Sequence, residues 1–193
     1  MRDVQNMKKM RFSKLSGVVA VAALLGVPAM AADDLETEMQ TCNACHGQNG
    51  QPIDVNIPII WGQQTSFLVK QLHDYKSKDR DNPIMTPLAE QIKQPDIRKV
   101  AMYFAAKPWP AKNAAVAAQA APDGMAVCRI CHQPNFEGGL PAPRLAGQSY
   151  DYLLSAMNNF ADGTRDNNMD MVKLMQGTTP EQRQAFARYL ASL

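Results

Sequence analysis

The chain has 193 residues, of which 46% are hydrophobic and 20% charged, a composition typical of globular proteins. This length favours two small domains of about 80 to 90 residues over a single minimal module. Domains of that size often need a disulfide, a metal or a large cofactor for stability. No basic stripe with interleaved aromatic residues is present, so composition and charge give no case for nucleic-acid binding.

Residues 1–31 have the features of a secretory signal peptide. Basic residues precede an apolar run from Leu15 to Val27 and the small-residue site Ala29-Met30-Ala31, so we expect cleavage after Ala31 and export to the periplasm. The run has 13 residues, against roughly 20 in a membrane-spanning helix, which disfavours an uncleaved anchor without excluding it. The residues removed include Arg2, Lys8, Lys9, Arg11, Lys14 and Asp3. The formal charge therefore changes from +2 to −2, which favours partners with a basic docking surface.

All four cysteines lie in two pairs, and a histidine directly follows each pair. The two motifs are Cys42-Asn43-Ala44-Cys45-His46 and Cys128-Arg129-Ile130-Cys131-His132. Both fit the pattern of c-type haem attachment. Two thiols one helical turn apart can add to the two vinyl groups of haem, while the adjacent histidine binds the iron. We therefore expect two covalently bound haem c groups, with His46 and His132 as iron ligands.

Other uses of paired cysteines are weaker but stay open at this point. A zinc site built from the four thiols would leave the histidine after each pair unexplained. Structural disulfides or a thioredoxin-like redox pair suit an oxidising compartment. However, a thioredoxin-like motif belongs to a strand–helix unit that this sequence does not indicate.

The second half of the chain repeats the first. The cysteines and the histidine of the motif recur at an offset of 86 residues, and segment 58–63 recurs as 143–148 at an offset of 85. Aromatic and polar positions up to Asn82 keep the offset of 85. Past Asn82 the offset returns to 86, which pairs Met85 with Met171. We conclude that the halves are copies of one fold.

Met85 and Met171 are the candidates for the sixth ligand of each iron. Each lies 39 residues after the histidine of its motif and follows an Arg-Asp-Asn triplet. A methionine thioether is a soft ligand suited to haem iron with a raised potential. Methionine also fills gaps in protein cores, and the chain has 12 of them. In the second half Met169 competes with Met171, and the sequence leaves that choice open.

Periodicity predicts an all-α fold. Apolar residues at helical spacing predict a helix over Gln64 to Lys76 and a copy of it one repeat later. A closing helix is expected after Pro95-Asp96, and another after the N-cap signal Thr179-Pro180-Glu181. Glycine and proline clusters around 52–58 and 138–143 indicate irregular chain.

A change of composition separates the halves. Lys107-Pro108-Trp109-Pro110 is followed by an alanine-rich stretch, which predicts a short, semi-rigid linker. The expected organisation is a signal peptide (1–31), an N-terminal domain (32–107), a linker (108–121) and a C-terminal domain (122–193).

The duplicated motif, the Pro-x-x-x-Gly-Gln segments and the Arg-x-Asn approach to a methionine resemble the dihaem cytochrome c4 family over residues 35–193. The resemblance implies two tandem class I cytochrome c domains packed face to face, each wrapped around one covalently bound haem. It also implies that Pro58 and Pro143 offer carbonyls to the rings of the iron-binding histidines. One departure is that Gln133 follows the second motif where Gly47 follows the first, which leaves the backbone turn after His132 undetermined.

The function that the resemblance implies is electron transfer from a respiratory donor towards a terminal oxidase. An alternative is the electron-transfer subunit of a periplasmic dehydrogenase that oxidises sulfide, thiosulfate or an alcohol. A haem enzyme is disfavoured, because there is no spare cysteine and only one spare histidine, His73, which we expect on an exposed face. We expect redox protein partners, no nucleic acid and at most peripheral membrane contact. A basic cluster from Lys70 to Arg80 is either ordinary surface or a docking patch.

Overall fold

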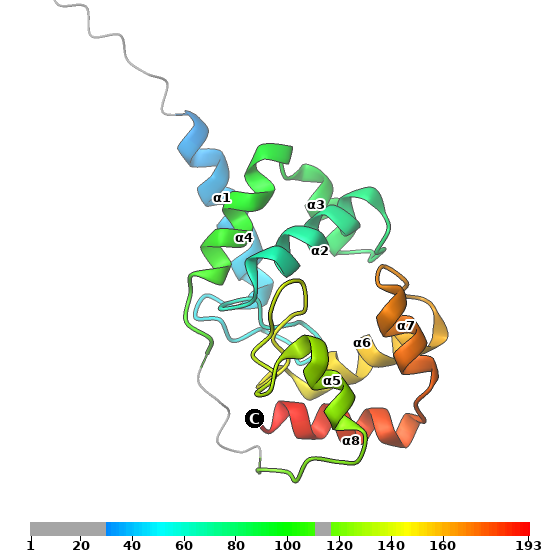
Figure 1. Cartoon of the computed structure of the whole chain (residues 1–193). Helices are drawn as coiled ribbons and strands as arrows, with labels where there is room; N and C mark the ends of the chain where they lie inside the picture. Colours follow the sequence, from blue (N-terminus) through cyan, green and yellow to red (C-terminus); the bar gives the residue numbers. More distant parts are fainter. Residues whose placement is uncertain (1–29, 111–116) are drawn as a thin grey trace, which may run out of the picture.

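The computed structural model describes residues 30–110 and 117–193, with side chains from Leu35 onward. Every regular element in these two ranges is a helix, arranged as two lobes that follow one another in the chain (Figure 1). This confirms the all-α prediction. The expected signal peptide lies outside the described residues except for its last two positions, and so does the middle of the expected linker, residues 111–116.

The first half contains α1 (Met30–His46), α2 (Thr65–Ser77), α3 (Met85–Gln91), the 3-10 helix η1 (Gln94–Asp96) and α4 (Ile97–Ala105). The second half contains α5 (Met125–His132), α6 (Tyr150–Asp162), α7 (Met169–Gln176) and α8 (Pro180–Ala191). Their order shows the repeat, since α1, α2, α3 and α4 correspond to α5, α6, α7 and α8 (Figure 1).

Each half has its own hydrophobic core. In the first half α2 packs against α4, and Val100 and Phe104 of α4 are almost completely buried. In the second half α6 packs against α7 and α8, around Phe136 and Leu190. Two separate cores are what a duplicated fold requires, because each copy buries its own apolar helix faces.

Local sequence signals explain where the predicted helices begin. Thr179 caps α8 through a reciprocal capping box: its hydroxyl accepts from Gln182 N–H at 3.2 Å, and its own N–H donates to Gln182 Oε1 at 2.8 Å. Pro95 lies in η1, the single 3-10 turn that leads into α4. The predicted helix from Gln64 to Lys76 is α2, displaced by one residue at each end.

The turn after the second motif is made with a residue ill suited to it. Gly47 follows the first motif with a φ of +92°, and Gln133 follows the second with φ +70° and ψ 163°. That conformation is almost confined to glycine, because it brings a Cβ against the backbone. The departure from glycine therefore leaves a left-handed φ in place after His132 and puts strain at Gln133.

The two halves contact each other through reciprocal hydrogen bonds. The side chain of Gln148 accepts from Ile59 N–H at 2.9 Å and donates to the Ile59 carbonyl at 3.0 Å. Gln63 makes the equivalent pair with the backbone of Arg144, at 2.7 and 3.0 Å. Both glutamines are buried. Gln63 and Gln148 are equivalent positions of the repeat, and so are Ile59 and Arg144. The same contact is therefore made twice, once in each direction.

A second contact between the halves uses the polar triplets before the two methionines. Arg165 donates to Gln71 Oε1 at 2.9 Å, and Asn167 donates to Asp74 Oδ2 at 2.6 Å. From the first half, Arg80 donates to the same Gln71 oxygen at 2.7 Å. The Arg-Asp-Asn segments thus contribute to the interface between the halves.

Candidate haem sites

The ends of α1 and α5 carry the two motifs. In each helix the first cysteine is partly buried and the histidine is buried, with 7% of His46 and 6% of His132 exposed. Cys42 packs against the core of the first half and Cys128 against the core of the second. The two cysteine pairs therefore serve separate cores, which argues against a shared zinc site.

Both histidine rings are oriented by the same backbone contact. His46 Nδ1 lies 2.8 Å from the Pro58 carbonyl oxygen, and His132 Nδ1 lies 2.8 Å from that of Pro143. A carbonyl can only accept, so Nδ1 carries the proton and Nε2 keeps a free lone pair. Burial lowers the pKa of both histidines, and the bond to the proline carbonyl opposes this only in part. Each ring is thus a neutral imidazole with Nε2 available to bind a metal.

An apolar cavity lies beside the second motif. Its lining includes Cys128, His132 and Met171. The remaining lining residues are all apolar: Leu145, Met157, Leu174, Met175, Phe186 and Leu190. A thiol, an imidazole and a thioether therefore surround one hydrophobic space, which is the donor set and the setting that a c-type haem requires.

The structure separates the two competing methionines of the second half. Met171 lines the cavity, whereas 57% of Met169 is exposed to solvent. Met171 N–H donates to Asn168 Oδ1 at 3.1 Å, and Met85 N–H donates to Asn82 Oδ1 at 2.9 Å. Each bond spans three residues, so Met171 occupies the same place relative to its asparagine as Met85.

Asn168 is a residue that sequence reasoning missed. The sequence comparison paired Asn82 with Asn167, yet the structure gives the capping bond to Asn168 and turns Asn167 towards Asp74 of the other half. The sequence did contain a signal for Asn168. If the offset returns to 86 before this asparagine instead of after it, Asn82 pairs with Asn168.

The first thiol of each motif is not poised as a free nucleophile. Burial, with a smaller contribution from Glu38, raises the pKa of Cys42 to about 11, and burial also raises the pKa of Cys128. Both thiols are therefore protonated at neutral pH. This fits residues that form a lasting thioether better than thiols that exchange disulfides, because exchange depends on the thiolate.

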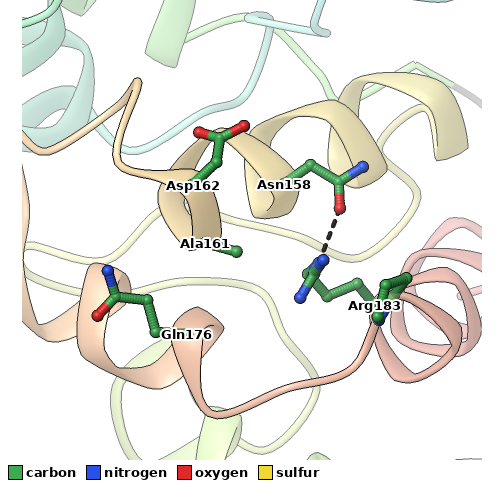
Figure 2. A pocket seen from close by; sticks show the side chains of 6 residues that line it. Asn158, Ala161, Asp162, Gln176 and Arg183 are labelled. Atoms are coloured by element: carbon green, nitrogen blue, oxygen red, sulfur yellow. Dashed lines mark hydrogen bonds between the residues drawn. The ribbon is translucent and has the colours of Figure 1, made fainter.

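A second hollow lies between the ends of α6, α7 and α8 (Figure 2). Arg183 spans it, donating to Asn158 Oδ1 at 2.7 Å and to the Thr178 carbonyl at 2.7 Å. Asp162 accepts from Thr164. Arg183 thus joins α6 to the loop before α8, and Cys128 and His132 of the second motif line a different cavity.

The basic cluster of the first half has internal partners. Lys70 forms an ion pair with Asp74 at 2.5 Å, and Lys76 donates to three main-chain carbonyls at the end of α3. Arg80 is directed towards Gln71. Lys70 and Lys78 are exposed, as ordinary surface residues are, whereas Lys76 and Arg80 are half-buried and bound to partners within this half. His73 is half-buried, and its Nδ1 lies 3.5 Å from Gln94 Nε2 in a solvent-exposed contact.

Comparisons with known proteins agree with this geometry. The Cytochrome c family model matches residues 111–193. Cytochrome c4 of Pseudomonas aeruginosa is 32% identical over 153 residues, covering 73% of this chain and 76% of that protein. The chain belongs to the cytochrome c4 family. The cytochrome c4 structure of Acidithiobacillus ferrooxidans superposes with a TM-score of 0.72 at 30% identity, covering 80% of this chain and 99% of that one. The thiosulfate dehydrogenase electron acceptor of Stutzerimonas stutzeri is 31% identical over 205 residues, covering 93% of this chain and 94% of that protein.

Membership in the cytochrome c4 family establishes the general function. The chain is a dihaem electron carrier with two covalently bound haem c groups, and its halves are tandem cytochrome c domains. Two cysteine–histidine helix ends, two oriented imidazoles and an apolar cavity with a thioether provide what this cofactor needs. Within residues 30–110 and 117–193, no helix is long and apolar enough to cross a membrane.

Proposed function

We propose that the two haem groups are attached through Cys42 and Cys45 in the first half and through Cys128 and Cys131 in the second. His46 with Met85, and His132 with Met171, would hold the two irons. The matched 2.8 Å contacts between histidine and proline carbonyl carry this proposal, together with the position of Met171 in the cavity lining.

The oriented histidines would hold each haem iron in a fixed place. When bound, each haem supplies a one-electron couple between ferric and ferrous iron. Pro58 and Pro143 fix the histidine rings and raise the basicity of Nε2 through the bond at Nδ1. The second-half cavity surrounds Met171 with apolar side chains. Two protein ligands on each iron in an apolar setting favour outer-sphere electron transfer and leave no position for a substrate, so we assign no catalytic residue.

The proposed biological role is that of a periplasmic carrier between a respiratory donor and a terminal oxidase. The acidic charge of the chain after residue 31 supports docking to partners with basic surfaces. The proposed domain limits are a signal peptide (1–31), an N-terminal domain (32–107), a linker (108–121) and a C-terminal domain (122–193).

A second candidate role is acceptor of electrons from a thiosulfate dehydrogenase. It is supported by the similarity to the Stutzerimonas stutzeri protein of that name over 94% of its length. The two roles use the same haem sites and differ only in the partner. Two assays on the purified protein distinguish the roles. One measures the second-order rate constant for its reduction by a thiosulfate dehydrogenase, and the other measures that for its oxidation by a terminal oxidase.

The ligand proposal is tested by the visible spectrum of the reduced protein before and after addition of carbon monoxide, with haem quantified against protein. Two haems per chain and an unchanged spectrum are expected, because both irons hold two protein ligands. A carbon monoxide complex at one haem would refute the assignment for that half. Measurement of the N-terminal residue of the exported protein tests cleavage after Ala31.

A further inference from the structure

One peptide group links the iron-binding histidine of the first half to the second half. The carbonyl of the Pro58–Ile59 peptide accepts the bond from His46 Nδ1 at 2.8 Å. The N–H of the same peptide donates to Gln148 Oε1 at 2.9 Å. His46, Ile59 and Gln148 are all buried, so water does not compete for these bonds.

The second half contains the same arrangement in reverse. The carbonyl of the Pro143–Arg144 peptide accepts from His132 Nδ1 at 2.8 Å, and its N–H donates to Gln63 Oε1 at 2.7 Å. Each glutamine also returns a bond to the carbonyl of the next peptide, which fixes its amide with the oxygen towards the N–H. Each half thus supplies the acceptor that completes the other half's chain of bonds.

Hydrogen bonds on the two sides of a peptide group strengthen each other. When the N–H donates to an acceptor, the carbonyl oxygen becomes more negative and accepts more strongly, by about 10 to 30% per bond. A stronger bond at Nδ1 makes the imidazole a better donor at Nε2, which stabilises ferric over ferrous iron. The acceptor oxygen of Gln148 therefore acts on His46, and that of Gln63 acts on His132.

We infer that Gln63 and Gln148 are positioning residues that set the potential of the iron in the opposite half. The inference rests on the proposed histidine ligands. Its consequence is that the contact between the halves is part of the ligand environment: opening the contact raises both potentials, and closing it lowers them.

The test compares Gln148→Met with Gln63→Met in the full-length holoprotein. Methionine keeps the length of the side chain but offers no oxygen acceptor. NMR of protein labelled with ¹⁵N-histidine monitors a redox titration. Each oxidation step is thereby assigned to the iron bound by His46 or to the iron bound by His132. The Nδ1–H resonance of the ferrous protein reports the strength of the bond to the proline carbonyl.

Each variant is expected to act across the interface. Gln148→Met increases the equilibrium constant for reduction of the His46 iron about two- to fourfold, about 18 to 35 mV at 59 mV per tenfold change. The His132 iron shifts by less than half as much, and the His46 Nδ1–H resonance moves upfield. Gln63→Met gives the mirror pattern. Equal shifts of both potentials in each variant, or no shift, would overturn the inference.

Glutamate variants keep the test decisive if methionine disrupts folding. Gln148→Glu and Gln63→Glu retain an acceptor oxygen, so the Nδ1–H resonance of the opposite half is expected to stay or move downfield. A downfield shift confined to the mutated half contradicts the relay. A wild-type histidine resonance that does not respond to the oxidation state would instead refute the ligand assignment.

Discussion

Replacing Gln133 with glycine is expected to stabilise the protein, although it deletes a whole side chain. Gln133 holds φ +70° and ψ 163°, a region that costs a residue with a Cβ about 1 to 3 kcal/mol. Its side chain is exposed, so little packing is lost. Glycine adds about 0.4 to 1 kcal/mol of unfolded-state entropy, which opposes the gain. The net expectation is a rise of about 0.5 to 2 kcal/mol in the free energy of unfolding.

Guanidinium denaturation of the holoprotein, followed by circular dichroism and by the Soret band, measures this change. The matched control is Gln48→Gly, an exposed turn residue of the first half whose φ is not left-handed. That variant pays only the entropic term and is expected to lose about 0.4 to 1 kcal/mol. If Gln133→Gly lost as much stability as Gln48→Gly, the strain at Gln133 would be refuted.

Three further pairs of substitutions test the ligand choice, the packing and the helix capping of the second half. Met171→Ala is expected to open one haem of the two to carbon monoxide, whereas Met169→Ala, at an exposed position, leaves the spectrum unchanged; the reverse result would reassign the ligand. Phe136→Ala removes a side chain with 0% exposure and should cost about 3 to 5 kcal/mol in chemical denaturation, against a smaller loss for Phe136→Leu. Thr179→Ala breaks the capping box of α8 and should cost about 0.5 to 2 kcal/mol, while Thr179→Ser, which keeps the hydroxyl, should lie near the wild type in a thermal melt.

The features that sequence predicts here are the local ones. The boundaries of α2 and α8 follow from apolar spacing and from the cap at Thr179, because both signals act within a few residues. The two motifs predict the cofactor, because their spacing matches the chemistry of the attachment. Local rules did not predict the strained turn at Gln133, where tertiary packing holds a residue that a turn of this kind disfavours.

The contacts between distant residues were beyond the sequence. Gln63 and Gln148 stood out only as repeated positions, and nothing in their neighbourhood identifies a backbone partner more than 80 residues away. Lys76 was expected on a charged surface, yet it caps the end of α3, because free carbonyls at a helix C-terminus attract a cation. Asn168 was not predicted because it follows another asparagine, Asn167. Two identical neighbours allow the repeat to be aligned in either of two registers that differ by one residue.

The reciprocal glutamine contacts give the chain the geometry of a homodimer within one polypeptide. An interface in which residue i of one copy binds residue j of the other, and j binds i, is isologous. The partners of Gln63 and Gln148 are main-chain groups, so the pairing does not depend on which side chains stand at Ile59 and Arg144. Each half therefore carries both members of the pairing, a glutamine and a main-chain partner. Joining the two copies in one chain makes their association intramolecular, at a high effective concentration.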